Sequence, residues 1–184
     1  NNYSYVVEKS GDFVITTCAS ANVSIHARFS FGGFAINAPY LTGIALKCSE
    51  DSQGAELFPY GNLQGSEPGL SRTRSVTDSS IRDNLMCTKS GFKLSVIHQS
   101  LGDAKYMSAE IRSTGMAWDC AGLLGVIGHT AETDLTYRGT LKGYGALSIP
   151  RSIRDAMIDS WKVRADEKIF KTSLSGSDAP SSTK

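Results

Sequence analysis

The chain repeats itself at a distance of 72 residues, and this repeat limits the possible folds more than any other sequence feature. Three strings recur without a gap: Ile25-His26 as Ile97-His98, Thr42 to Cys48 as Thr114 to Cys120, and Ser80 to Asp83 as Ser152 to Asp155. Eleven of the 60 positions from Ser24 to Asp83 are identical at this offset, whereas unrelated sequences would share about three or four. The repeat predicts one globular domain over 1–172, made of two units at about 14–83 and 84–155 with a C-terminal short helix and strand. The Ser-rich residues 173–184 are predicted to be a disordered tail.

Four cysteines, Cys18, Cys48, Cys87 and Cys120, show neither a C-x-x-C motif nor a Cys/His cluster at zinc spacing. We therefore expect no metal site and no cofactor. The even number and the separations within each unit predict two disulfides formed in an oxidising compartment. The favoured pairing closes each unit on itself, as Cys18–Cys48 and Cys87–Cys120. Two symmetric alternatives stay open: Cys18–Cys87 with Cys48–Cys120, and Cys18–Cys120 with Cys48–Cys87.

Short β-rich runs, such as 13–17, 23–29 and 92–98, recur between Gly, Ser, Asn and Pro turn signals. This spacing predicts an all-β fold of antiparallel strands, with α+β as the alternative. Ile153, Met157 and Trp161 recur at helical spacing, so a short helix is predicted over 152–164. Its counterpart at 80–86 is predicted to be a degenerate turn, and the basic stretch 72–74 a flexible loop.

Two cysteine-containing strings resemble a known family. Gly43 to Cys48 follows the pattern Gly-hydrophobic-x-hydrophobic-x-Cys about 30 residues after a cysteine, and Cys87 is followed by Gly91-Phe92-Lys93-Leu94. Both patterns are similar to the repeated unit of vitelline membrane outer layer protein I. The resemblance implies a β-prism of Greek-key sheets in a secreted protein associated with glycans. It assigns no functional residue.

Charge and hydropathy exclude several partner classes. Nineteen basic and eighteen acidic residues give a formal net charge of +1, so the chain as a whole has no strong nucleic-acid signal. The longest apolar stretches, such as 123–127, are far shorter than the roughly 20 residues that span a bilayer. We therefore expect no membrane span.

Features near the N-terminus favour an extracellular protein. The sequence begins Asn1-Asn2 without Met, which fits removal of a signal peptide. Asn2-Tyr3-Ser4 and Asn22-Val23-Ser24 both satisfy the acceptor rule for N-glycosylation. Secretion and glycosylation at Asn2 and Asn22 are the resulting predictions.

The repeat places His26 and His98 at equivalent positions. Two histidines with a carboxylate such as Glu110 would suit general acid–base hydrolysis of RNA or another phosphodiester. The structural alternative is that each histidine holds a turn in its unit. Arg82-Asp83 and Arg154-Asp155 could likewise form an anion site. The structural alternative for each pair is an ion pair or a helix cap.

The sequence contains no nucleophile elbow, phosphate loop or zinc-protease motif. Four tyrosines near Gly- and Pro-containing loops could instead contact sugars or proteins: Tyr40, Tyr60, Tyr137 and Tyr144. We therefore expect a secreted binding protein for a glycan or an extracellular or host protein, of the kind used as coat or effector proteins. The alternative is a small secreted hydrolase or nuclease-like toxin that uses the paired histidines.

Overall fold

The computed structural model describes residues 7–31, 39–112, 120–123, 125–126, 135–136, 138, 143–144 and 150–171. The predicted all-β class is confirmed, because antiparallel strands dominate and α1 (Arg151–Ser160) is the single α-helix of these residues. The strands are β1 Gly11–Cys18, β2 Val23–Ser30, β3 Tyr40–Lys47, β4 Ala55–Leu57, β5 Gln64–Gly65, β6 Leu70–Val76, β7 Ile81–Cys87, β8 Phe92–Leu101, β9 Ala104–Arg112, β10 Cys120–Gly122, β11 Gly125–Val126, β12 Leu135–Thr136 and β13 Gly143–Tyr144. A short 3-10 helix, η2, follows at Ala165–Glu167.

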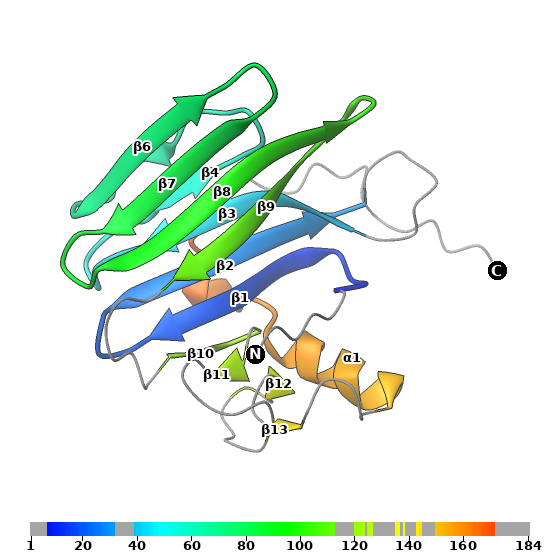
Figure 1. Cartoon of the computed structure of the whole chain (residues 1–184). Coiled ribbons are helices and arrows are strands. Elements are labelled where there is room, and N and C mark those ends of the chain that lie inside the picture. Colours follow the sequence, from blue (N-terminus) through cyan, green and yellow to red (C-terminus); the bar gives the residue numbers. More distant parts are fainter. Residues whose placement is uncertain are drawn as a thin grey trace.

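Two three-stranded meanders form the centre of the main sheet, whose order is β11-β10-β1-β2-β3-β9-β8-β7-β6 (Figure 1). The meanders β1-β2-β3 and β7-β8-β9 meet through their third strands, at the single pair Leu41 and Met107. Further along β3, strand β4 takes the place of β9 and pairs Leu57 with Ile44. The two meanders therefore diverge from a common point.

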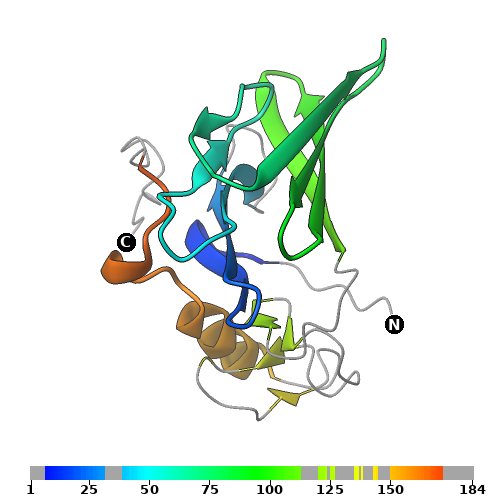
Figure 2. The ribbon, with the colours of Figure 1, turned by 90° about the vertical axis from the view of Figure 1, so that its left-hand side faces the viewer.

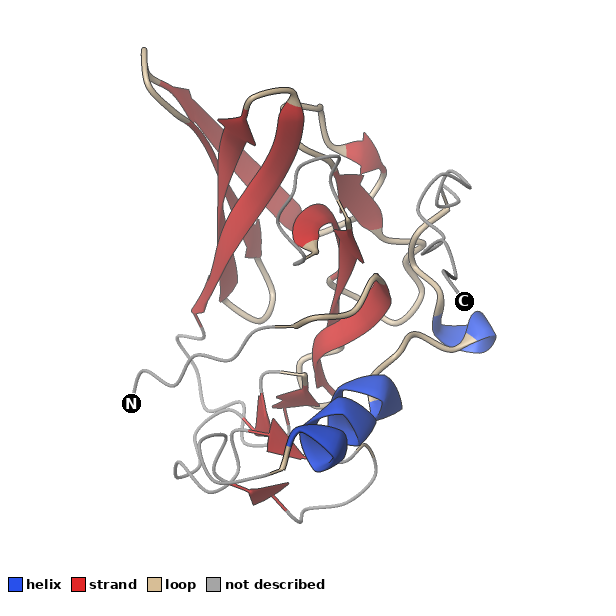
Figure 3. Cartoon of the chain, turned by 90° about the vertical axis from the view of Figure 1, so that its right-hand side faces the viewer, coloured by secondary structure: helices blue, strands red, loops and turns tan. Residues whose placement is uncertain are grey.

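The sheet curls around its core. Strands β3 and β7 are separated by β9 and β8, which in a flat sheet would place them about 14 Å apart, at about 4.8 Å per strand. Cys48, directly after β3, nevertheless has its Cα 5.4 Å from that of Cys87 at the end of β7. Figures 2 and 3 show, from opposite sides, β6 to β9 standing over the β1–β3 part of the sheet, with α1 at the far end of the molecule.

Apolar side chains of both meanders fill the space inside the curl. The alternation of apolar and polar residues directs one face of each strand inward. The buried cluster includes Phe13, Ile25, Ile44, Leu46, Leu57, Leu85, Phe92, Leu94 and Val96. This core fixes which face of β6 to β9 remains exposed.

The C-terminal segment 162–171 begins beside the edge of β1 and ends in an apolar contact with β3 and Phe58. Val163 N–H donates to Asp12 O at 2.9 Å, and Lys162 forms an isolated β-bridge with Phe13. Phe170 packs with Phe58, Ala45 and Ile169 in a second, smaller apolar cluster. The strand predicted after the C-terminal helix is thus reduced to one bridge within the described residues, and the tail 173–184 lies outside them.

Both predicted disulfides form, but the favoured pairing within units is wrong. The bridges are Cys18–Cys120 and Cys48–Cys87, one of the two alternatives left open. The physical reason is strand order. Strand β2 lies between β1, which ends at Cys18, and β3, which ends before Cys48. Two strand spacings, about 10 Å, exceed the Cα separation that a disulfide spans.

The equivalence of the two Ser-Ile-Arg-Asp strings is also wrong. Residues 81–83 begin strand β7, where a turn was predicted, whereas residues 152–155 lie in helix α1. The predicted helix at 152–164 is confirmed in part, because α1 covers 151–160 whereas residues 161–164 are not helical. The basic stretch 72–74, predicted as a loop, belongs to strand β6.

The histidines occupy different places in their hairpins. The β1–β2 and β7–β8 hairpins have matching closing pairs, Cys18 with Val23 and Cys87 with Phe92. Counted from these pairs, Ser95 corresponds to His26. The 72-residue offset therefore does not follow the hairpin register. The string 114–119 lies outside the described residues, so its match with 42–47 stays a prediction.

Candidate functional site

Among the residues that the structure describes, Asp83 accepts the largest set of side-chain hydrogen bonds, and its side chain is fully buried. It accepts hydrogen bonds from Arg72 Nε and His98 Nε2, each at 2.7 Å, and from Arg74 Nη2 at 3.1 Å. Burial raises the pKa of Asp83, but the hydrogen bonds from Arg72 and His98 and the charges of both arginines outweigh it and hold the pKa below its usual range. We call these four residues and Tyr60 the Asp83 network.

His98 has a structural role in this network. The backbone N–H of Tyr60 donates to His98 Nδ1 at 2.8 Å, so Nε2 carries the ring proton and donates it to Asp83. Both ring nitrogens are engaged and the side chain is fully buried. No ring nitrogen of His98 is left for proton transfer to a substrate.

The network also holds the loop after β4. Tyr60 has a backbone φ of 60°, a conformation that costs about 1 kcal/mol or more outside glycine. Arg74 Nη2 donates to Gly61 O at 2.8 Å, next to the Tyr60 N–H that binds His98. Tyr60 is 37% exposed, and the centroid of its ring lies 5.9 Å from Lys105 Nζ. The Asp83 network thus presents this aromatic ring to solvent.

The proposed histidine pair and its carboxylate do not come together. His26 is on β2 and His98 on β8, with β3 and β9 between them in the sheet. Glu110, on the exposed face of β9, pairs with Arg112 at 2.8 Å. The hydrolase hypothesis required these three side chains in one site, and the fold places them in three environments.

His26 lines a cavity of about 250 Å³ between the outer face of β1 to β3 and the C-terminal segment, which we call the His26 cavity. Its described lining is Val14, Thr17, Ser24, His26, Lys47, Arg138, Glu167 and Ile169. Ser24 Oγ lies 3.2 Å from His26 Nε2. Burial lowers the pKa of His26 to about 4. The charges of Glu167 and Asp12 raise the pKa but do not offset the burial, and the charge of Arg138 lowers it further. The imidazole is therefore neutral at neutral pH.

The four tyrosines do not form one described surface. Tyr40 packs on Tyr106, with ring centroids 5.1 Å apart, whereas Tyr60 packs near His98. Tyr137 and the side chain of Tyr144 lie outside the described residues, as does Asn2. Asn22, the other predicted glycosylation site, is exposed in the β1–β2 turn with a φ of 51°. The turn leaves its side chain accessible.

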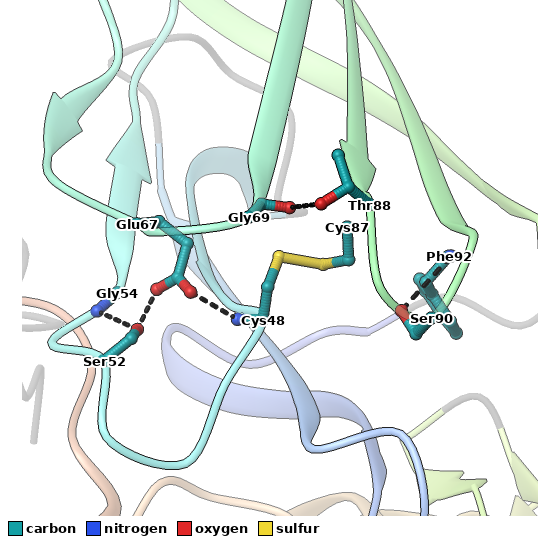
Figure 4. Close-up of a disulfide and its surroundings, with 9 residues drawn as sticks. All are labelled: Cys48, Ser52, Gly54, Glu67, Gly69, Cys87, Thr88, Ser90 and Phe92. Carbon is teal, nitrogen blue, oxygen red and sulfur yellow. Dashed lines mark hydrogen bonds between the residues drawn. A yellow bond between two sulfur atoms is a disulfide. The ribbon is translucent and has the colours of Figure 1, made fainter.

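A buried carboxylate supports the Cys48–Cys87 bridge (Figure 4). Glu67 accepts hydrogen bonds from Cys48 N–H at 3.0 Å and from the Ser52 hydroxyl. Burial raises the pKa of Glu67. The backbone N–H groups of Cys48 and Gly54 and the charge of Lys47 lower it by less, so the pKa stays above its usual value. All of its contacts tie the 48–54 turn to the segment before β6, so Glu67 is structural.

The outer face of β6 to β9 is hollowed, a feature that the sequence did not single out. The hollow has a volume of about 420 Å³, and we call it the polar hollow. Its outward side chains are Ser71, Thr73, Arg82, Asn84, Met86, Lys93, Ser95, Glu110 and Arg112. They follow the two-residue alternation of the strands. An ordinary solvated sheet face has the same alternation, so no sequence signal distinguishes the hollow.

Side chains in the polar hollow form rows across the strands. Thr73 pairs with Asn84, Asn84 with Ser95, and Ser95 with Glu110. Directly opposed side chains lie about 5 Å apart, so one ligand can contact several of them. In a second row, Met86 pairs with Lys93 and Lys93 with Arg112.

Groups of His, Cys, Asp and Glu that could hold a metal ion are not found in the described part of the chain. The described residues also contain no helix that is long and apolar enough to cross a membrane. A scan against models of known protein families finds no match to this chain, and a search of curated proteins finds none either.

Proposed function

We propose that the protein is a secreted, disulfide-stabilised binding protein that recognises an acidic glycan in the polar hollow. The observation that carries the proposal is the hollow itself: a concave volume of about 420 Å³ on a rigid sheet, lined by hydroxyl, amide and charged groups. Pockets that bind small molecules usually measure about 300 to 1,000 Å³. The hollow therefore has room for one or two sugar rings.

The charges favour an anionic ligand. Arg82, Lys93 and Arg112 stand against one carboxylate, Glu110, which gives the lining a formal charge of +2. Glu110 pairs with Arg112, whereas Arg82 and Lys93 have no ion-pair partner among the described residues. A uronate or sulfate group would supply the missing anion and accept charge-assisted hydrogen bonds.

The lining favours a glycan over a protein partner. The centre of a protein interface is usually apolar and rich in aromatic side chains, but Met86 is the only outward apolar side chain of the described lining. The same lack of an aromatic ring in that lining disfavours neutral sugars, which stack on such rings. Thr73, Asn84 and Ser95 instead match the hydroxyls of a sugar in hydrogen-bonding capacity.

The two disulfides support secretion, because disulfides form and persist in oxidising compartments. The exposed position of Asn22 is compatible with glycosylation in the same compartment.

A glycan array with uronate-containing, sulfated and neutral oligosaccharides tests the proposal. We expect the protein to bind the acidic oligosaccharides of the array. Titration calorimetry at low and high salt then measures the affinity. Affinity should fall with ionic strength, because exposed ion pairs are screened. Binding only to neutral sugars, to RNA or to a protein in place of glycans would contradict the proposal.

Matched variants locate the site. Replacing both Arg82 and Lys93 by Gln should weaken binding roughly 10- to 100-fold, the equivalent of one charge-assisted hydrogen bond. The control replaces Lys89 and Lys168 by Gln, which removes the same charge from exposed positions outside the hollow. Equal losses in both double variants would mean that net charge, and not the polar hollow, attracts the glycan.

A further inference from the structure

Strand β6 ends the main sheet on one side, and among the described strands it pairs only with β7 (Figure 1). Its other edge therefore has no β partner within the part of the chain that the structure describes. Figure 2 shows the β6–β7 hairpin projecting away from the rest of the molecule. We call the unpaired side of β6 the free edge.

The first and last hydrogen bonds between β6 and β7 establish which backbone groups point to the free edge. Thr88 N–H donates to Gly69 O at 2.7 Å at one end, and Thr77 N–H donates to Ser80 O at 2.9 Å at the other. In an antiparallel pair, residues bonded to the neighbouring strand alternate with residues whose N–H and C=O groups point away from it. Counted from either end, the same residues point to the free edge, and they are Arg72, Arg74 and Val76.

Strand β6 lacks most of the features that usually keep a free edge from pairing. Its seven residues include no proline, and its register with β7 is unbroken from residue 70 to 76, so no β-bulge bends the edge away. The side chains on its outer face are small, uncharged and exposed, and they are Ser71, Thr73 and Ser75. A second strand can therefore approach the free edge without displacing a large or charged side chain on that face.

The two arginines of β6 do not prevent pairing either. A charge that points inward protects an edge strand when pairing would bury that charge alone. Arg72 and Arg74 point inward, but both are ion-paired to Asp83, at 2.7 and 3.1 Å. Asp83 lies on β7, so these contacts hold the arginine side chains on the inner side of the β6–β7 hairpin. The Asp83 network thus compensates the charges before any strand is added.

We propose that two copies of this chain pair along the free edge of β6, antiparallel, and form a two-fold symmetric dimer with one continuous sheet. A second copy fits this edge because antiparallel pairing of a strand with itself is self-complementary: edge-facing N–H groups of each copy meet C=O groups of the other. The outer-face hydroxyls of one β6 then lie opposite those of the other, and such cross-strand pairs are favourable. That face of β6 has no charge, so pairing opposes no like charges there.

The dimer would also join the two polar hollows. The two-fold axis of an antiparallel strand pair is perpendicular to the sheet, so the outer faces of both copies lie on the same side. Ser71 and Thr73 line the β6 border of the polar hollow, and they would lie next to the outer face of the second copy. Binding of one acidic glycan chain by both hollows rests on the proposed function, whereas the strand pairing does not.

Sedimentation velocity of the disulfide-intact chain at increasing concentration tests for the dimer without any glycan, and amide hydrogen exchange followed by NMR tests for the added strand. We expect a concentration-dependent dimer in which the N–H groups of Arg72, Arg74 and Val76 gain protection. The N–H groups of residues 71, 73 and 75 bond to β7 and should be protected in the monomer as well. A chain that stays monomeric up to about 1 mM, or a dimer in which the edge N–H groups stay unprotected, would overturn the proposal.

Val76→Pro and Val76→Ala are the matched variants. Val76 is 67% exposed and its N–H points to the free edge, so proline removes a donor there without breaking the β6–β7 ladder. The dimer loses two hydrogen bonds, one from each copy, so Val76→Pro should weaken dimerisation about 10- to 100-fold. Val76→Ala keeps the N–H and should dimerise like the unmodified protein. Equal weakening by both variants, or no weakening by Val76→Pro when circular dichroism shows that it is folded, would contradict strand pairing.

Discussion

Replacing Asp83 by Asn tests whether the Asp83 network stabilises the fold. Asp83 Oδ1 accepts from Arg72 Nε, and Oδ2 accepts from Arg72, Arg74 and His98. An amide has one acceptor oxygen. In its better orientation that oxygen keeps the three bonds at the Oδ2 position, while the amide nitrogen faces the Arg72 Nε–H donor. The variant therefore loses one bond and the negative charge that strengthened the others.

The expected loss is about 3 kcal/mol of unfolding free energy. A hydrogen bond to a charged acceptor contributes about 1 kcal/mol more than one to a neutral acceptor, and breaking a buried ion pair costs about 3 to 5 kcal/mol. The lower figure applies because the Arg72 and Arg74 side chains are 20% and 25% exposed and can be partly solvated. A domain of this size is usually stable by about 5 to 15 kcal/mol, so the variant should still fold.

Urea denaturation of the disulfide-intact protein, followed by circular dichroism, measures the loss. Asp78→Asn, at an exposed position between β6 and β7, is the control and should change stability by less than about 0.5 kcal/mol. Because folding lowers the pKa of Asp83, its contribution is present above the unfolded pKa of about 4 and disappears as the pH falls through the folded pKa. A loss below about 1 kcal/mol, or one that is unchanged in acid, would refute this account.

Three further predictions concern the disulfide, the C-terminal segment and His26. Replacing Cys48 and Cys87 together by Ala should cost about 4 kcal/mol, the chain-entropy value for a 39-residue separation, as measured by urea denaturation of the folded variant. Phe170→Ala should cost about 3 kcal/mol, because it empties the outer apolar cluster, whereas the exposed Lys168→Ala should have little effect in the same assay. Folding lowers the pKa of His26 from 6.5 to about 4, so the free energy of unfolding should fall by about 3 kcal/mol as the pH drops from 6.5 to 4. The His26→Asn variant should lack this decrease in thermal melts recorded across the pH range. The charged groups around His26 are Asp12, Lys47, Arg138 and Glu167.

The candidate sites were only partly accessible from sequence. His26 and His98 were singled out together, but their different roles depend on the surroundings: Asp83 and Tyr60 occupy both nitrogens of His98, while His26 faces a cavity with one nitrogen free. Arg72 and Asp83 were considered separately, and strand pairing makes them an ion pair. Burial and hydrogen-bond partners arise between segments distant in sequence, so local motifs do not encode them.

The sequence by itself determined the β class, the helix after residue 150 and the use of the cysteines in disulfides. These follow from alternation, helical spacing and cysteine number, which are local or compositional properties. Only the tertiary structure decided the pairing of the cysteines and the fate of Ser-Ile-Arg-Asp. Pro150 precedes the second copy and favours the start of a helix there. In the first copy, residues 81–83 belong to β7 and pair with β6 on one side and β8 on the other. The string is short enough to adopt either conformation, so its neighbours in space select between them.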